Sequence, residues 1–250
     1  MLKMFMYAFF LLVLSLEVYA KIPSVQVEVV NVLPHPGEGF TQGLFYHEGL
    51  LYEGTGLYHR SSIASYQLNG ASFEKVVSLP RFFGEGITLF KNKLYQLTWK
   101  AGRLFVYDFP GMELSDSLSY KGDGWGLTSD GTHFIMGNGS DTLYFRDSNF
   151  QVLWRLPVRS EGLPVTNLNE LEYTGESILA NIWFENHIVD IDPQSGEVKR
   201  HINCDRIFQI ENPQRPEQVL NGIAFNPETK TLFLTGKYWK YIFEVKVPGL

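Results

Sequence analysis

The segment Arg81–Trp99, RFFGEGITLFKNKLYQLTW, shows most clearly a frame that is repeated along the chain: a short head of glycine, acidic and aromatic residues, followed by runs with strand character. One acid, Glu85, stands near its head between Gly84 and Gly86, and the two phenylalanines Phe82 and Phe83 precede this Gly-Glu-Gly run. Because glycine weakens a strand, two glycines around one acid predict that another backbone approaches closely here. Aromatic rings beside a carboxyl group displace water and raise its pKa. Glu85 is therefore a candidate for a group that both accepts and donates a proton near neutral pH.

The same frame recurs five times along the chain. Each copy begins with a short head of glycine, amide, acidic or aromatic residues, and consecutive heads lie roughly 40 to 52 residues apart, which is typical of propeller blades. The heads are Phe40–Leu44, Phe83–Ile87, Gly124–Leu127, Leu168–Leu171 and Leu220–Ile223.

Further runs follow each head and alternate between apolar and polar residues, as half-buried strands do. The first four repeats each contain three such runs after the head, whereas the fifth contains only two, the last being Tyr241–Val247. The segment Val25–Val32 has strand character and precedes the first head, so it can supply the missing outer strand. The sequence therefore predicts an all-β fold, a five-bladed β-propeller whose ring is closed by the N-terminal strand.

Two segments interrupt the period. Arg159–Asn167 precedes the fourth head, and Cys204–Gln218 precedes the fifth. The second is polar and contains proline, which predicts a long surface loop. The sequence predicts no amphipathic helix of any length.

The N-terminus has the features of a secretory signal. Lys3 is followed by the apolar run Phe5–Leu16, and Val18–Ala20 offers small residues at the positions that precede cleavage, before Lys21. We therefore expect residues 1–20 to be a signal peptide, residues 21–250 to be one propeller domain, and the protein to be exported to the periplasm or secreted. An uncleaved membrane anchor is the alternative. Since the chain contains one cysteine, Cys204, an intramolecular disulfide is excluded.

Composition limits the partners. The 250 residues carry a formal charge of −6, which does not favour nucleic-acid binding. The six histidines are scattered without the spacing of metal ligands, so we expect no zinc site and no cofactor. We further expect a monomer that has no membrane contact once the signal is removed.

Several side chains should meet at the mouth of the central channel. In a propeller the innermost strands line the channel, so the heads bring Gln42, Glu85, Trp125, Asn169 and Asn221 to related positions, and the ends of the second runs add Trp99, Trp183 and Lys237. Apolar walls with a few convergent polar groups are typical of a ligand pocket. Each residue also has a structural interpretation, because buried acids and amides commonly bond to backbone groups and tryptophans commonly pack between strands.

Eight motifs occur in an order that is specific in combination: FTQGL (Phe40–Leu44), EGTGLYHRSS (Glu53–Ser62), FGEG (Phe83–Gly86), GWG (Gly124–Gly126), LNELEY (Leu168–Tyr173), ANIW (Ala180–Trp183), LNGI (Leu220–Ile223) and TGK (Thr235–Lys237). Together they resemble the plant-type and bacterial glutaminyl cyclases, over about Val25–Val247. The resemblance implies a five-bladed propeller that converts N-terminal glutamine of peptides or proteins to 5-oxoproline, releases ammonia, and needs no metal for catalysis. A structural calcium ion occurs in plant members, but no Asp-rich run predicts its ligands here.

The resemblance also implies roles for individual residues. The catalytic acid of the family falls on Glu85, and its other pocket residues fall on Gln42, Asn169, Lys237, Trp99, Trp125, Trp183, Phe40 and Phe83. On this basis we expect Glu85 to move the proton and Lys237 or Asn169 to stabilise the oxyanion. The alternatives are a non-catalytic propeller that binds a peptide or protein, and a propeller hydrolase or lyase that acts on small esters or lactones.

Overall fold

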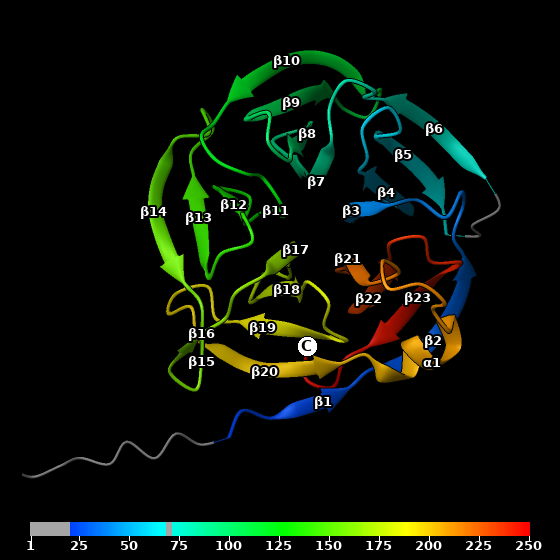
Figure 1. Cartoon of the computed structure of the whole chain (residues 1–250), viewed down its shortest axis with the longest axis vertical. Helices are drawn as coiled ribbons and strands as arrows, with labels where there is room; N and C mark the ends of the chain where they lie inside the picture. The colour runs from blue at the N-terminus through cyan, green and yellow to red at the C-terminus, as the bar shows by residue number, and fades with distance from the viewer. Residues whose placement is uncertain (1–20, 69–71) are drawn as a thin grey trace, which may run out of the picture.

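A computed structural model describes residues 21–68 and 72–250, so the predicted signal peptide lies outside the described residues. Five sheets stand around a central axis, with their innermost strands at the centre of the ring and their outermost strands at its rim (Figure 1). The prediction of an all-β, five-bladed propeller is confirmed.

Each blade uses consecutive strands from the centre outward. Blade 1 contains β3 (Thr41–His47), β4 (Leu50–Thr55), β5 (Ser62–Gln67) and β6 (Phe73–Ser78). Blade 2 contains β7 (Gly84–Phe90), β8 (Lys93–Thr98), β9 (Arg103–Asp108) and β10 (Glu113–Ser119). Blade 3 contains β11 (Leu127–Ser129), β12 (Phe134–Met136), β13 (Thr142–Arg146) and β14 (Val152–Pro157). Blade 4 contains β17 (Leu168–Tyr173), β18 (Ile178–Ile182), β19 (His187–Ile191) and β20 (Val198–Asn203).

Blade 5 is completed by the N-terminal part of the chain. Its strands are β21 (Leu220–Asn226), β22 (Thr231–Gly236), β23 (Tyr241–Lys246) and, on the outside, β2 (Glu28–Pro34), which pairs antiparallel with β23. The predicted closure is therefore correct, but the predicted strand Val25–Val32 is divided. Its first part belongs to β1 (Ser24–Gln26), which pairs parallel with β20 of blade 4. The division lies at Val27, whose buried side chain joins the core between these two blades.

The hydrophobic core lies in the seams between blades. Five apolar clusters are present in the described structure, and each joins the facing sheets of two neighbouring blades. Between blades 1 and 2, for example, Tyr52 and Ile63 share a cluster with Ile87 and Leu94. Full burial of one such aliphatic side chain contributes about 1.5–3 kcal/mol, so every blade is held mainly by its two neighbours.

Glycines let the innermost strands approach each other. A Cβ atom on Gly86 would lie 2.5 Å from the backbone nitrogen of Leu127, and one on Gly126 would lie 2.0 Å from the carbonyl oxygen of Asn169. These distances are shorter than any side chain tolerates. The close approach predicted from the glycines around Glu85 is therefore present, and it narrows the centre of the ring.

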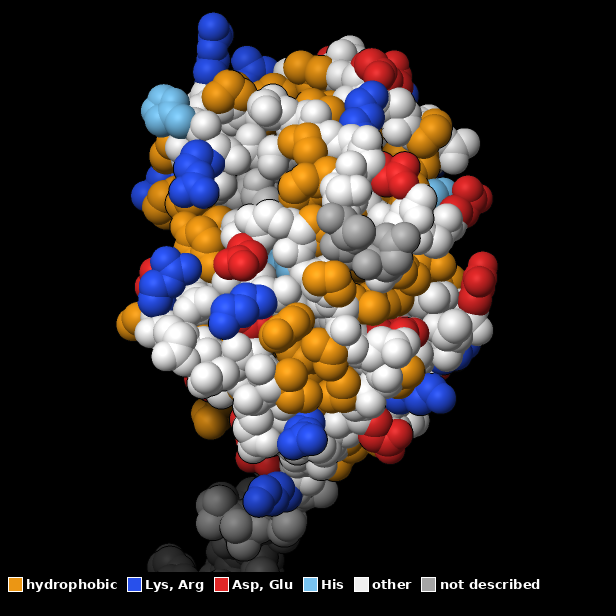
Figure 2. Space-filling view, turned by 90° about the vertical axis from the view of Figure 1, so that its right-hand side faces the viewer, with side chains coloured by type: hydrophobic (Ala, Val, Ile, Leu, Met, Phe, Trp, Pro, Cys, Tyr) orange, Lys and Arg blue, Asp and Glu red, His pale blue; other side chains and the backbone are white. Residues whose placement is uncertain are grey.

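The outer strands cover the sides of the ring. Figure 2 shows the side formed by β2 and β6, where hydrophobic side chains lie among charged and polar ones. Val30 and Val32 of β2 and Phe73 and Val76 of β6 are exposed there.

The segment Cys204–Gln218 is only in part the surface loop that its polarity predicts, because residues 212–218 form a largely exposed loop but the residues before them are helical. It begins with the short helix α1 (Asp205–Glu211), whose Ile207 is buried in the core between blades 4 and 5. The carboxylate of Glu211 accepts hydrogen bonds from the backbone N–H groups of Lys240 and Tyr241. The prediction of no helix is therefore wrong, because tertiary contacts at both ends stabilise seven residues that carry too short a pattern to stand out.

Two smaller features complete the fold. The segment before the fourth head forms the hairpin of β15 (Arg159–Ser160) and β16 (Leu163–Pro164). Cys204 is buried as a free thiol. Over residues 21–68 and 72–250, no helix has the length and apolar character needed to cross a bilayer.

Candidate functional site

The polar residues of the heads lie in breaks of the strand register. In four of the five blades the pairing between the innermost strand and the next one shifts at the head, so that a β-bulge is formed. The bulged positions include Gln42, Glu85, Asn169 and Asn221. A bulge redirects side chains away from the regular alternation, and here it turns polar groups toward the channel mouth.

Three of these side chains, those of Gln42, Glu85 and Asn169, line a cavity of about 220 Å³. It contains all nine residues predicted for the site, together with Leu57: Phe40, Gln42, Phe83, Glu85, Trp99, Trp125, Asn169, Trp183 and Lys237. Pockets for drug-sized ligands occupy roughly 300–1,000 Å³, so this cavity suits a smaller group such as one amino-acid residue. Leu57 was not predicted, although it follows the glycine of the EGTGL motif and adopts a left-handed backbone with φ of 82°.

Glu85 is the only carboxyl group among the described residues that line this cavity. Its side chain is 3% exposed, and its Oε2 atom accepts a hydrogen bond of 2.7 Å from Nε2 of Gln42. Burial raises the pKa of Glu85 well above its usual range, while the positive charge of Lys237 and the bond from Gln42 oppose this rise. A carboxyl group with a raised pKa holds its proton more strongly than an exposed glutamate does, so Glu85 is suited to donate a proton as well as to accept one.

A second amide fixes the orientation of Gln42. Nδ2 of Asn221, from blade 5, donates to Oε1 of Gln42 at 3.2 Å and to the carbonyl oxygen of Thr41 at 2.8 Å. With its oxygen engaged by Asn221, Gln42 presents its NH₂ group to Glu85. Asn221, which was predicted at the mouth, therefore lies behind Gln42 and does not line the cavity.

Lys237 supplies the positive charge of the cavity. Its side chain is buried, and Nζ lies 4.6 Å from the centre of the Phe40 ring and 6.0 Å from that of Trp183. Burial lowers the pKa of Lys237 to about 8, and the charge of Glu85 limits the decrease. Within the described structure, Lys237 forms no direct ion pair with Glu85, so the two groups face the same cavity with space between them.

Asn169 brings an uncommitted amide to the same cavity. Its Oδ1 atom is buried and has no hydrogen-bond partner among the described residues. A buried polar atom without a partner costs free energy, roughly 1–3 kcal/mol, unless a ligand supplies one. Asn169 is therefore placed to bond to a molecule in the cavity.

Aromatic side chains form the walls. Phe83 contacts Phe40 and Trp99 edge to face, with ring centres 6.1 and 5.4 Å apart, and Trp125 contacts Trp183 in the same way at 5.5 Å. Trp183 is 38% exposed, which places it at the opening. Rings that support one another in this way offer rigid apolar surfaces to the aliphatic part of a ligand.

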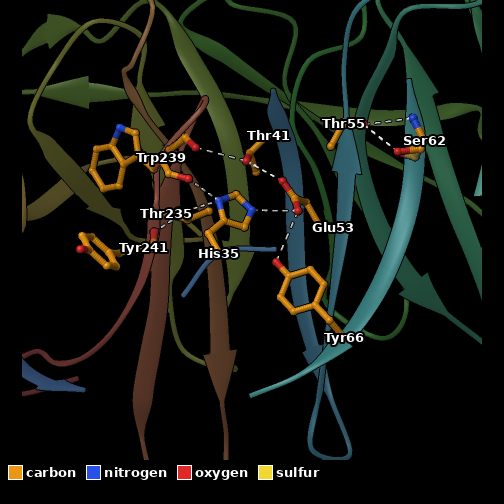
Figure 3. Close-up of polar contacts among 10 residues, drawn as sticks. His35, Thr41, Glu53, Thr55, Ser62, Tyr66, Thr235, Trp239 and Tyr241 are labelled. Carbon is orange, nitrogen blue, oxygen red and sulfur yellow. Dashed lines mark hydrogen bonds and ion pairs between the residues drawn. The ribbon is translucent and has the colours of Figure 1, made fainter. Parts of the chain in front are cut away.

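A buried polar network supports this side of the ring where it closes. Nδ1 of His35 lies 2.9 Å from the carbonyl oxygen of Trp239, and Nε2 lies 3.0 Å from Oε2 of Glu53 (Figure 3). Oε1 of Glu53 accepts a bond of 2.6 Å from the hydroxyl of Thr41, the residue before Gln42. Because both ring nitrogens of His35 face acceptors, the protonated ring fits best. Although burial disfavours the charge, Glu53 and the carbonyl group raise the pKa of His35 above its usual value.

Two further acids lie on the axis of the ring. Both oxygens of Glu170 accept backbone N–H groups, from Leu44 of β3 and Ile223 of β21, and Glu172 accepts the N–H group of Phe225. Burial raises the pKa of both carboxyl groups, that of Glu172 to about 8. Sequence reasoning placed only Glu85 on the axis. These two acids connect blades 1, 4 and 5. In the part of the chain that the structure describes, no three His, Cys, Asp or Glu side chains are grouped in a way that could hold a metal ion.

The sequence model of one family, glutamine cyclotransferase, matches residues 4–247. The chain belongs to the glutamine cyclotransferase family. A glutaminyl-peptide cyclotransferase of Arabidopsis thaliana is 34% identical over 228 residues, which cover 89% of this chain and 71% of that protein. The crystal structure of Myxococcus xanthus glutaminyl cyclase superposes with a TM-score of 0.86 at 32% identity, covering 91% of this chain and 98% of that one.

Membership confirms the predicted family and the prediction of an enzyme. In this glutamine cyclotransferase, sequence reasoning missed mainly the supporting residues. His35 gave no signal because its partners are not neighbours in the chain: Glu53 is 18 residues away and Trp239 is 204 residues away. Glu170 and Glu172 stood inside the LNELEY motif, and their spacing of two residues along one strand would have placed them on the same face.

Proposed function

We propose that this glutamine cyclotransferase converts N-terminal glutamine of peptides or proteins to 5-oxoproline and releases ammonia. The observation that supports this most strongly is the placement of Glu85. It is a buried carboxyl group with a raised pKa, and it shares one small cavity with the ammonium group of Lys237 and the amide of Asn169, whose Oδ1 atom has no partner among the described residues. Intramolecular acyl transfer needs these three kinds of group and little else.

The walls hold the substrate in the conformation that closes the ring. The side chain of glutamine is flexible, and cyclisation requires the γ-carboxamide to fold back onto the α-amine of the same residue. Trp99, Trp125 and Trp183 can pack against the methylene groups and exclude extended conformers. Holding the reacting atoms at attack distance removes much of the entropic part of the barrier.

Glu85 moves the proton. The ionised carboxylate accepts a proton from the α-amine as its nitrogen forms a bond to the γ-carbonyl carbon. The same group then donates that proton to the leaving nitrogen, so that the carbon–nitrogen bond breaks and ammonia departs. Glu85 returns to its ionised form, and Gln42 holds it in place by the bond of 2.7 Å. Catalysis of this kind contributes ~10²- to 10⁴-fold in rate.

The γ-carbonyl oxygen becomes negative when the amine attacks. Lys237 is the charged donor in the cavity, and the NH₂ group of Asn169 is the neutral one. A donor that is already oriented toward this oxygen contributes ~10²- to 10³-fold. Gln42 acts mainly through Glu85.

The proposal includes four further properties. Catalysis proceeds without a metal ion, which is supported by the chemistry of the described lining, where one carboxyl group is accompanied by an amine, amides and aromatic rings. The protein acts after export, in the periplasm or outside the cell, which is supported by the signal pattern of residues 1–20. It acts as a monomer and tolerates varied residues after the glutamine.

The test is product identity. Purified protein is incubated with a Gln-initiated peptide, and the products are analysed by mass spectrometry. We expect the loss of one ammonia from the intact peptide and no change in a peptide that begins with Glu. Tight binding of the Gln peptide without conversion would instead indicate a non-catalytic propeller and contradict the proposal.

A further inference from the structure

A cleft between blades 2 and 3 has no part in the proposed reaction. Its volume is about 820 Å³, much larger than the substrate cavity, and the two have no lining residue in common. One wall is the end of β10 with the connection that follows it, residues 119–123, and the other is formed by β12, β13, β14 and their turns. This volume is in the range of roughly 300–1,000 Å³ that is typical of sites for small organic molecules.

Arg146, the last residue of β13, lies at the base of this cleft. Its side chain is 7% exposed, and the centre of its guanidinium group lies 4.6 Å from the ring of Phe150, 5.8 Å from Tyr144 and 5.9 Å from Tyr120. Nη1 donates to the carbonyl oxygen of Phe150 at 2.8 Å. Nε is buried and has no hydrogen-bond partner among the described residues.

No described carboxylate neutralises the charge of Arg146. Guanidinium remains protonated in proteins and offers five N–H donors in a planar fork. Within residues 21–68 and 72–250 no carboxylate forms an ion pair with Arg146. A buried cation without a counter-ion is unfavourable, and aromatic faces compensate for the lost water only in part. The missing partner is an anion.

The rim of the cleft is also positive. Lys121 and Arg155 line it and are exposed, and neither forms an ion pair with a described carboxylate, whereas Asp123 is the one acid in the described lining. This local excess of positive charge stands on a chain whose net charge is −6. Charged walls of one sign concentrate ligands of the opposite sign.

We propose that this cleft binds an organic carboxylate. The fork of Arg146 takes the carboxylate group in a bidentate pair, the geometry that guanidinium favours. Tyr120, Tyr144 and Phe150 enclose the apolar body of the ligand, and Lys121 and Arg155 attract it. The carboxylate belongs either to a free organic acid or to an acidic side chain of a bound peptide.

The test uses benzoate as the carboxylate probe and benzamide as its neutral counterpart. Calorimetric titration of the whole protein should show saturable binding of benzoate and at least tenfold weaker binding of benzamide. In Arg146→Gln benzoate affinity should fall at least tenfold, whereas in Arg206→Gln, which removes an exposed arginine from α1 on another side of the ring, it should not change. Equal binding of the two probes, no saturable binding, or full affinity in Arg146→Gln would overturn the proposal.

Two further arms keep the test decisive. If Arg146→Gln does not fold, Arg155→Gln at the rim should still weaken benzoate binding several-fold. Unchanged benzoate affinity in Arg155→Gln would contradict the proposed electrostatic attraction of the carboxylate to the rim. Turnover of Gln-initiated peptides with Glu or Gln at one later position then identifies the source. If Arg146→Gln raises the KM of the Glu-containing peptide but not that of the Gln-containing peptide, the natural carboxylate is a peptide side chain. If Arg146→Gln has the same KM as the wild type for both peptides, while the wild type binds benzoate, the natural ligand is a free organic acid.

Discussion

Replacement of Glu85 by Gln separates catalysis from stability. The substitution keeps the shape of the side chain, and its new amide oxygen can accept the bond that Gln42 now donates at 2.7 Å. Because the site raises the pKa of Glu85, the fold disfavours the charged form, and a neutral amide should leave the free energy of unfolding within about 1 kcal/mol of the wild type. The amide cannot exchange the proton, so kcat should fall by ~10²- to 10⁴-fold, or about 3–5 kcal/mol in the barrier.

Ammonia release from a Gln-initiated dipeptide measures kcat, and thermal unfolding measures stability. Glu172→Gln makes the same chemical change on the axis, outside the cavity, and should keep its turnover. If Glu85 were only a structural acceptor, the Glu85→Gln protein would keep both its stability and a kcat close to that of the wild type. That pattern would refute the reasoning, and the proton transfer would have to be assigned to another group.

Four further results are expected. Trp183→Ala should raise KM several-fold with a smaller change in kcat, because it removes part of a wall at the opening, and steady-state kinetics would contradict this if kcat alone fell. The value of kcat/KM should decline above about pH 8, where Lys237 loses its proton, and Lys237→Arg should move this decline to higher pH. A decline at the same pH in Lys237→Arg would contradict a catalytic role for the ammonium group of Lys237. His35 has a raised pKa in the fold, so its stabilising contribution is present below about pH 6.5 and is lost as pH rises through the folded value. The difference in melting temperature between about pH 5 and about pH 9 should therefore shrink in His35→Gln, and an identical difference would contradict its charge. Gly86→Ala should lower the free energy of unfolding, measured by urea denaturation, by about 1–3 kcal/mol, because its Cβ would lie 2.5 Å from a backbone nitrogen. An unchanged free energy of unfolding would show that the innermost strands can move apart to accommodate the methyl group.

The propeller could be predicted because its signal is repeated. Alternation of apolar and polar residues is a local property, and five copies of one frame reinforce each other even where a single strand, such as β11 (Leu127–Ser129), is short. The helix α1 occurs once and spans seven residues, so no repetition supported it. Its stability depends on Ile207 in the core and on Glu211 bound to a distant strand, neither of which the local sequence reveals.

The residues of the cavity could be named for a related reason. Each polar member occupies the head of a repeat, and propeller geometry brings the heads together around one axis. The β-bulges that turn Gln42, Glu85 and Asn169 toward the mouth were not predictable, because the alternation gives the face of a side chain only in a regular strand. The cleft around Arg146 was missed because its charge is unusual only once its burial and its lack of a counter-ion are known.

The most direct test of the central claim compares ammonia release from two substrates in the presence of EDTA: a dipeptide with free N-terminal glutamine, and the same dipeptide with its α-amine acetylated. In the proposed reaction the α-amine is the nucleophile and the proton carrier is Glu85. Ammonia should therefore be released from the free dipeptide alone, with one 5-oxoproline formed for each ammonia. Equal release from the acetylated dipeptide would show hydrolysis of the side-chain amide, and loss of turnover in EDTA that added metal restores would show metal-dependent chemistry. Either result would contradict the account.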